Sequence, residues 1–163
     1  PEQARTAAED HHDPGGHSLK ARSSLGTRLT EISVDCSDPA AQAAFWAAAL
    51  GYHVTRSEHG QVEIGPWERE PPDLADQVRR APTVPTLVFA TVPEGKTVKN
   101  RLHLDIRPVD GSQEAEVERL LGLGARHVDI GQGEVPWVVL ADPEGNEFCV
   151  LASLTTLDEN GSP

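Results

Sequence analysis

The sequence predicts an α+β fold built from two tandem βαβββ modules. The first observation is an internal repeat, in which residues 31–34 (Glu-Ile-Ser-Val) and 103–106 (His-Leu-Asp-Ile) are each followed at the same distance by an aspartate. A helical run that ends at a glycine then follows in both places. The second observation is the strict alternation of polar and apolar residues in both tetrapeptides, which is the period of a β-strand. A chain that repeats one strand–helix unit is expected to fold as two similar modules.

Composition limits the number of domains and the partners. The chain has 163 residues, a formal net charge of −12 and two cysteines. We expect a single domain, because a module of about 60 residues buries too little surface to be stable alone. An acidic surface repels nucleic acid and anionic membranes, so neither is an expected partner. Without a long apolar run or a signal-peptide core we expect a cytoplasmic protein, with both cysteines as reduced thiols.

The boundaries follow from shifts in composition. We place the domain at residues 28–152, with module one at 28–93 and module two at 99–152. Residues 1–27 are rich in Pro, Gly, Ser and charge, which predicts a disordered tail, and 153–163 form a polar tail. The first tail holds His11, His12 and His17. A histidine cluster can bind metal, but a tail has no surrounding hydrogen bonds to orient such ligands, so we exclude it from the fold.

In module one, a strand is expected over residues 29–35. Asp38-Pro39 then begins a helix that runs to Leu50, and Gly51 ends it. The other strands are expected at 52–57 and 61–66, joined as a hairpin through His59-Gly60, and at 86–92. The segment 67–85 has adjacent prolines and a short predicted helix over 73–80, and its length suggests a lid over a functional site.

Module two repeats this order. A strand is expected over 101–107, with Leu102 and its apolar neighbours under a helix and the polar residues on the opposite face. The helix is expected over 112–123. The remaining strands are expected at 125–130, 135–141 and 147–152, the last after a turn at 142–146 that has Pro and Gly in turn positions.

Several strings of residues resemble the vicinal oxygen chelate superfamily, which includes glyoxalases, bleomycin-resistance proteins and extradiol dioxygenases. They are Asp38-Pro39, Phe45-Trp46, Leu50-Gly51-Tyr52, the segment 99–105 (Lys-Asn-Arg-Leu-His-Leu-Asp) and the segment 142–150 (Asp-Pro-Glu-Gly-Asn-Glu-Phe-Cys-Val). The closer resemblance is to the glyoxalase-like domain branch common in actinobacteria, over residues 29–152. It implies a curved mixed sheet around a central cavity. It does not fix the reaction, because members include isomerases, lyases, dioxygenases, transferases and non-catalytic antibiotic binders.

The resemblance also implies a divalent metal held by inward residues of the first and last strand of each module. Those positions are occupied here by Glu31, Ala90, His103 and Cys149. Alanine cannot be a ligand. Magnesium and manganese prefer an octahedron of oxygen ligands, which Glu31 and His103 alone would not define. Zinc would accept Glu31, His103 and Cys149 with a water molecule. The alternative is that Cys149 is a small apolar filler and that no metal is bound.

Strand parity directs one polar set toward the cavity: Glu31, Ser33, Asp35, Arg101, His103, Asp105, Glu147 and Cys149. Burial and like charges in such an enclosure move pKa values toward neutrality. This suits proton abstraction next to a carbonyl, with His103 or Glu31 as general base and Arg101 holding a substrate anion. The alternative is a structural ion pair between Arg101 and Asp105, with His103 hydrogen-bonded within the sheet.

Four residues are expected to contact the substrate. Trp67 begins the long segment and Trp137 follows Pro136, and either indole could line a wall for a flat ligand. Core packing is the alternative for Trp137, and it is what we expect for Trp46. Ser33 and Cys149 complete the expected substrate contacts.

We therefore expect an enzyme of lyase or isomerase type that acts on a small organic molecule. Its expected catalytic residues are Glu31, Arg101, His103 and Asp105, with Glu31 and His103 acting as an acid–base pair or as metal ligands. The alternative is a non-catalytic protein that sequesters a drug-like natural product. The modules either close on each other within one chain or are exchanged between two chains of a homodimer, and the sequence leaves both arrangements open.

Overall fold

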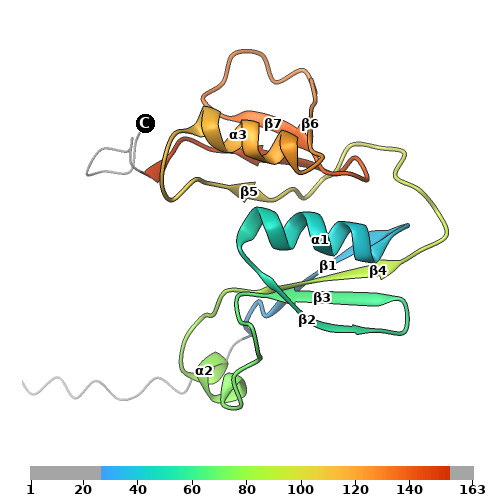
Figure 1. The fold of residues 1–163 in the computed structure, drawn as a ribbon, viewed down its shortest axis with the longest axis vertical. Coiled ribbons are helices and arrows are strands. Elements are labelled where there is room, and N and C mark those ends of the chain that lie inside the picture. The colour runs from blue at the N-terminus through green and yellow to red at the C-terminus, as the bar shows by residue number, and fades with distance from the viewer. Residues whose placement is uncertain (1–26, 155–163) are drawn as a thin grey trace, which may run out of the picture.

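Two modules of the same strand and helix order follow one another in the computed structural model, which describes residues 27–154 (Figure 1). The tails predicted at 1–27 and 153–163 lie almost entirely outside the described residues. Each module forms its own four-stranded mixed sheet, so the α+β class and the module order are confirmed. In the part of the chain that the structure describes, no helix is long and apolar enough to cross a membrane.

Module one has its sheet strands in the order β1-β4-β3-β2, with β1 and β4 parallel. Its elements are β1 (Glu31–Cys36), α1 (Pro39–Leu50), β2 (His53–Glu58), β3 (Gln61–Gly65), α2 (Leu74–Arg80) and β4 (Thr86–Thr91). The predicted ends of α1 are confirmed. Asp38 Oδ1 accepts hydrogen bonds from the N–H groups of Ala40 and Ala41, and Gly51 takes the left-handed conformation that ends the helix.

Module two has the equivalent order β5-β8-β7-β6, with β5 and β8 parallel. Its elements are β5 (Asp105–Ile106), α3 (Gln113–Gly122), β6 (Arg126–His127), β7 (Val138–Ala141) and β8 (Glu147–Val150). Ser112 begins α3 by accepting a hydrogen bond from the Ala115 N–H.

The predicted strand over 101–107 is much shorter in the structure, where only Asp105–Ile106 is a strand. Asp105 pairs with Cys149. In the same register Arg101 would lie opposite Gly145, which belongs to the turn before β8 and offers no strand to pair with. The prediction that Leu102 packs under a helix is therefore wrong, because this side chain is 91% exposed. The strands predicted at 125–130 and 135–141 are also shorter than expected.

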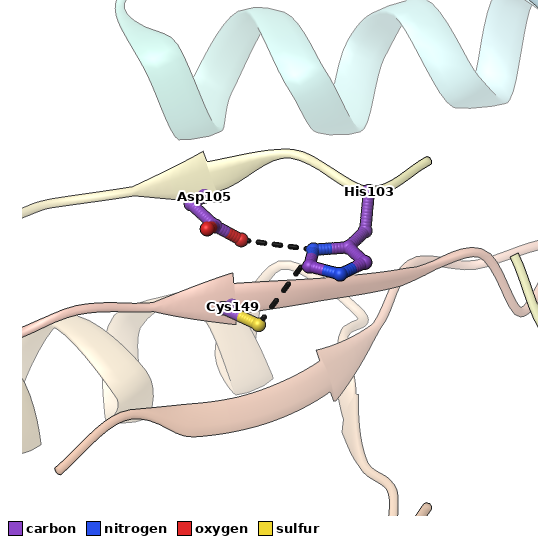
Figure 2. A group of neighbouring side chains, drawn as sticks. All are labelled: His103, Asp105 and Cys149. Atoms are coloured by element: carbon purple, nitrogen blue, oxygen red, sulfur yellow. Dashed lines mark hydrogen bonds and ion pairs between the residues drawn. The ribbon is translucent and has the colours of Figure 1, made fainter. Parts of the chain in front are cut away.

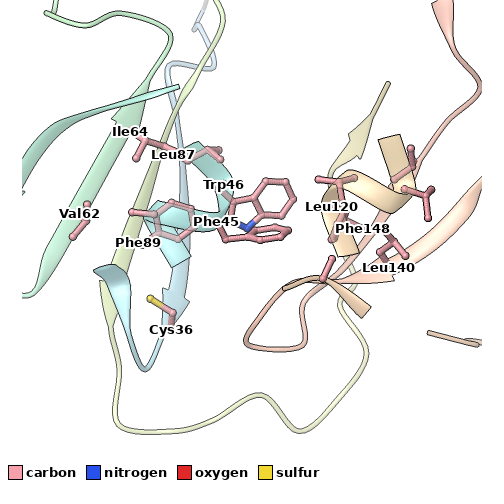
Figure 3. Close-up of a cluster of buried hydrophobic side chains, with 14 residues drawn as sticks. Cys36, Phe45, Trp46, Val62, Ile64, Leu87, Phe89, Leu120, Leu140 and Phe148 are labelled. Atoms are coloured by element: carbon pink, nitrogen blue, oxygen red, sulfur yellow. The ribbon is translucent and has the colours of Figure 1, made fainter. Parts of the chain in front are cut away.

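A single apolar core joins the modules. Phe45 and Trp46 of α1 make edge contacts with Phe148 of β8, with ring centroids 6.1 and 5.0 Å away (Figure 3). Arg119 of α3 donates hydrogen bonds to the carbonyls of Ala48 and Ala49 in the last turn of α1. Helix α1 thus lies between its own sheet and module two (Figure 1). The face of sheet one that is opposite α1 is left uncovered by module two.

Candidate functional site

A hollow of about 500 Å³ lies between the modules. Apolar side chains from both modules form much of its lining: Leu29, Ile32, Val34, Trp46, Leu87, Leu102, Leu104 and Phe148. Asn100, Arg101, His103 and Glu147 add polar groups to this wall. An apolar lining with a few polar groups is the usual composition of a site for a small organic molecule.

His103 lines this hollow and forms a polar pair with Asp105, which does not itself line it (Figure 2). His103 Nδ1 lies 2.9 Å from Asp105 Oδ1. Asp105 is the first residue of β5, and His103 lies two positions before it in extended chain, so the two side chains point to the same side. When Nδ1–H donates to the carboxylate, Nε2 keeps its lone pair and can accept a proton. The side chains are 37% and 47% exposed, so a ligand can reach them.

Cys149 adjoins this pair on the neighbouring strand β8. It is the register partner of Asp105, and its Sγ lies 3.9 Å from His103 Nδ1. Burial, and secondarily the hydrogen bond with Asp105, raises the pKa of the Cys149 thiol to about 11. The thiol is therefore neutral near pH 7 and is a poor nucleophile in the metal-free protein.

His103, Asp105 and Cys149 also form a group that could hold a metal ion. One ligand atom from each lies within 4.8 Å of the others. A nitrogen, an oxygen and a sulfur donor fit zinc, whereas magnesium prefers oxygen ligands throughout. Glu31 is not a member of this group.

Glu31 lies in a second hollow, of about 380 Å³, on sheet one. Ile32 and Val34 of β1 pack toward the core, and Glu31 lines a wall that it shares with Glu63 and Trp67. The segment 67–85 forms another wall of this second hollow, through residues that include Leu74 and Val78 of α2. The structure thus does not bring Glu31 and His103 together within one chain, because they line different hollows.

The other residues predicted for the site line one of the two hollows, apart from Trp137. Arg101 and Ser33 both line the hollow between the modules, and the Ser33 hydroxyl donates to Glu31 Oε1 at 3.3 Å. Trp67 lies beside Glu31, whereas Trp137 is 38% exposed and lines neither hollow.

Glu147 has a positioning role that the sequence did not reveal. Its carboxylate accepts hydrogen bonds from the Lys96 ammonium and the Asn100 N–H, both at 2.9 Å, and so holds the chain that leads into His103. Burial raises the pKa of Glu147, but these hydrogen bonds outweigh it, and the net pKa lies below its ordinary value. Strand parity places Glu147 on the same face as Cys149, but its partners come from a linker without periodicity and could not be predicted.

Comparisons with known proteins agree with this fold. Residues 31–151 match the family described as "Glyoxalase-like domain". A search of curated proteins finds no match. The fosfomycin resistance protein FosX from Mesorhizobium loti is similar in structure, with a TM-score of 0.53 and 11% identity over 78% of this chain and 93% of that one.

Two other solved structures give the same result. A glyoxalase-related enzyme from Fulvimarina pelagi has a TM-score of 0.51 and 14% identity, over 83% of this chain and 95% of that one. A glyoxalase/bleomycin resistance protein/dioxygenase family enzyme from Burkholderia phytofirmans PsJN has a TM-score of 0.50 and 17% identity, over 76% and 97%. At such identities these likenesses show the fold alone, and the actinobacterial branch stays a prediction. The family match and the fold together show that the chain belongs to the glyoxalase-like domain family, within the vicinal oxygen chelate superfamily.

Proposed function

We propose that the chain is an enzyme of lyase or isomerase type that acts on a small organic molecule in the hollow between the modules. One observation carries the proposal: the His103 imidazole is held by Asp105 at 2.9 Å beside a hollow with a largely apolar lining. An imidazole held in position beside a space that can take a small organic molecule is the arrangement that general acid–base catalysis needs. The names of the similar structures, an enzyme and a resistance protein among them, are compatible with this class of chemistry.

In this proposal each polar residue has a distinct role. His103 Nε2 accepts a proton from a carbon next to a carbonyl and returns it to a neighbouring atom or to the leaving group. Asp105 holds the ring and stabilises the imidazolium that forms, as a carboxylate beside a catalytic histidine does. Arg101, exposed at the same hollow, binds an anionic group of the substrate.

Glu31 enters the proposal through a second copy of the chain. Because it faces a hollow on sheet one, it can meet His103 only if module one of one chain lies against module two of its partner. We propose such a homodimer as an alternative to the hollow within one chain; in it Ser33 and Trp67 accompany Glu31 as substrate contacts, and Cys149 and Trp137 contribute from module two of the second chain. The uncovered face of sheet one supports this arrangement.

A divalent metal would change these roles. When bound, it supplies Lewis acidity that favours loss of a proton next to a carbonyl. His103 is then a ligand rather than a base, and Glu31 becomes the proton acceptor. Cys149, as a thiolate, and Asp105 would hold the ion with His103, since their ligand atoms lie within 4.8 Å of one another.

The test is exchange of carbon-bound hydrogen. The chain is incubated in deuterium oxide with a panel of small ketones, keto acids and diketones, and wash-in of deuterium is followed by nuclear magnetic resonance. We expect His103→Ala to abolish catalysed exchange and Asp105→Asn to reduce it, while His127→Ala, at an exposed histidine of β6, leaves it unchanged. Catalysed exchange that survives His103→Ala contradicts the proposal.

The dimer has its own test in mixed variants. His103→Ala and Glu31→Gln chains are each expected to exchange poorly. When they are mixed and allowed to reassociate, one shared site recovers both native residues, so part of the exchange should return. Mixing that restores nothing, or a monomer in light scattering, contradicts the shared site.

A second candidate function is sequestration of a drug-like natural product. The observation that favours it is the apolar lining of the hollow, in which Trp46 takes part. Binding of aromatic compounds should then quench tryptophan fluorescence, and mass spectrometry should recover each compound unchanged. Equal binding by the His103→Ala variant would favour sequestration over catalysis.

A further inference from the structure

The geometry points to a zinc site built within module two alone, from His103, Asp105 and Cys149. The family resemblance implies a ligand set shared between the modules through Glu31, and here Asp105 takes the place of Glu31. The inference shares His103 with the proposed function but needs no particular reaction, because metal uptake is measured directly.

The positions of the three side chains support the site. A tetrahedral zinc ion with bonds of about 2.0 to 2.3 Å needs its ligand atoms about 3.3 to 3.6 Å apart. His103 Nδ1 lies 2.9 Å from Asp105 Oδ1 and 3.9 Å from Cys149 Sγ, so these two distances bracket that requirement. Figure 2 shows the three side chains next to one another, so small rotations would bring all three donors to bonding distance of one ion.

The backbone fixes these donors relative to one another. Asp105 and Cys149 are register partners in the parallel pair of β5 and β8. The Cys149 N–H donates to the Leu104 carbonyl at 2.9 Å, next to the two exposed ligands. Because all three residues belong to module two, with Asp105 and Cys149 on directly paired strands and His103 two residues before Asp105, the site would form without any movement of the modules.

The chemistry of the donors selects the metal. A thiolate and an imidazole are preferred by zinc and its softer neighbours, while magnesium and calcium favour all-oxygen sites. On binding, Cys149 would release its thiol proton to solvent and form the Zn–S bond. Three protein ligands leave a fourth position, and the partial exposure of His103 and Asp105 leaves it open to water or substrate.

Zinc binding and the base role of His103 exclude each other. Ligation through Nδ1 leaves the hydrogen on Nε2, and that nitrogen can then no longer accept a proton. A zinc-loaded chain would therefore need a different proton acceptor from the metal-free chain.

The experiment measures metal directly on the full chain. Because His11, His12 and His17 could bind metal, all variants carry alanine at these positions. The protein is stripped with a chelator and titrated with Co²⁺ as a coloured substitute for zinc, and then with Zn²⁺. We expect one equivalent of either ion and a near-ultraviolet charge-transfer band from the cobalt–thiolate bond.

The variants assign the ligands. Cys149→Ser should remove the charge-transfer band, and His103→Ala and Asp105→Asn should each weaken zinc binding by about tenfold or more. Cys36→Ser is the matched control, at a thiol outside the cluster, and should leave stoichiometry and spectrum unchanged. Glu31→Gln separates this site from the shared ligand set that the resemblance implies, and metal uptake should survive it if Asp105 is the carboxylate ligand.

Three results would overturn the site: no stoichiometric uptake, a cobalt spectrum without a thiolate band, or loss of the metal in Glu31→Gln to the extent seen in His103→Ala. Circular dichroism checks that each variant is folded, and Asp105→Asn, which keeps the shape of the side chain, serves if His103→Ala fails to fold. Since no activity enters the assay, absent metal uptake leaves the base-catalysis proposal standing, and absent hydrogen exchange leaves the metal site standing.

Discussion

The buried carboxylate of Asp142 in module two accepts a hydrogen bond from the indole of Trp46 in module one, with Oδ2 3.2 Å from Nε1. The same oxygen accepts from Gln42 Nε2 at 3.0 Å. The other oxygen accepts from the N–H groups of Glu144 and Asn146 and closes the turn before β8. One carboxylate thus shapes the 142–146 turn and also holds α1 against module two, next to the hollow that both modules line.

Asp142→Asn should destabilise the protein by about 3 kcal/mol, because the amide cannot accept from Trp46 and Gln42 while keeping its bonds to the turn, and hydrogen bonds to a buried carboxylate are among the stronger ones. Urea unfolding measures the loss. Asp110→Asn, at an exposed aspartate of the same module, is the control and should change stability little. A loss in Asp142→Asn no larger than in this control would show that the carboxylate does not hold the modules together.

Glu144 should make stability depend on pH. Its carboxylate accepts from the Ser37 and Asp38 N–H groups at 2.8 and 2.7 Å, at the start of α1 in the other module. Burial raises the pKa of Glu144, but these bonds and that of the Ser37 hydroxyl outweigh it, so the net pKa lies below the ordinary 4.5. The folded state therefore favours the ionised form, and this stabilisation is complete above the unfolded pKa and lost as pH falls through the lower folded pKa.

The measurement is the free energy of unfolding in urea between about pH 6 and pH 3. Wild type should lose more stability on acidification than Glu144→Gln, whose amide does not titrate. Glu118→Gln, at an exposed glutamate of α3, should keep the slope of wild type. Equal slopes for wild type and Glu144→Gln would contradict the assignment.

The parts of the fold that local signals determine were predictable. Asp38 and Gly51 mark the ends of α1, because a side-chain cap and a left-handed glycine act within a few residues. The repeat, which is also read directly from the sequence, predicted the module order. The prediction of a strand over 101–107 was wrong outside Asp105–Ile106. Alternation shows only that a segment can pair, and not that a neighbouring strand is long enough to pair with it.

Some residues of the candidate site were likewise placed correctly from local signals, and others were not. Parity predicted that His103, Asp105 and Cys149 share a face, because side chains alternate along each strand and the parallel pairing brings β5 beside β8. The location of Glu31 depends instead on where α1 packs. That packing rests on contacts such as the one between Trp46 and Asp142, which are far apart in sequence and have no local signal.

The two thiols should react slowly in the folded, metal-free protein. Burial, together with nearby carboxylates, raises the pKa of Cys36 and of Cys149 to about 11 in each case. At pH 8 the thiolate fraction is then about a hundredfold lower than that of a thiol with a pKa of 9, and alkylation slows in proportion. Mass spectrometry of iodoacetamide-treated Cys36→Ser and Cys149→Ser chains follows each thiol separately.

Unfolding in urea is the control for that experiment, because it should restore fast alkylation of both residues. Alkylation of Cys149 in the folded chain at the unfolded rate would show that its thiolate is stabilised, and would make Cys149 a candidate nucleophile.

Gly65 should be intolerant of even a methyl group, because the Trp67 indole lies directly over it. A Cβ at this position would be 3.1 Å from Trp67 Cε3 and 3.2 Å from Thr86 Cγ2. Gly65→Ala must therefore push the indole, which lines the second hollow with Glu31, or the Thr86 side chain by a few tenths of an ångström, at a cost of about 1–2 kcal/mol typical of overpacking. Gly122→Ala is the matched control, since a methyl group there meets nothing within 4 Å.

The double variant Gly65→Ala/Trp67→Leu separates a clash with the indole from strain in the strand itself. If the indole is the obstacle, the two changes are not additive, and adding Gly65→Ala to a Trp67→Leu background should cost clearly less than it does in wild type. Urea unfolding gives the energies, and tryptophan fluorescence reports whether Trp67 has moved. The same cost in both backgrounds would place the strain against Thr86 and β4, and would remove Trp67 as the residue that requires glycine at position 65.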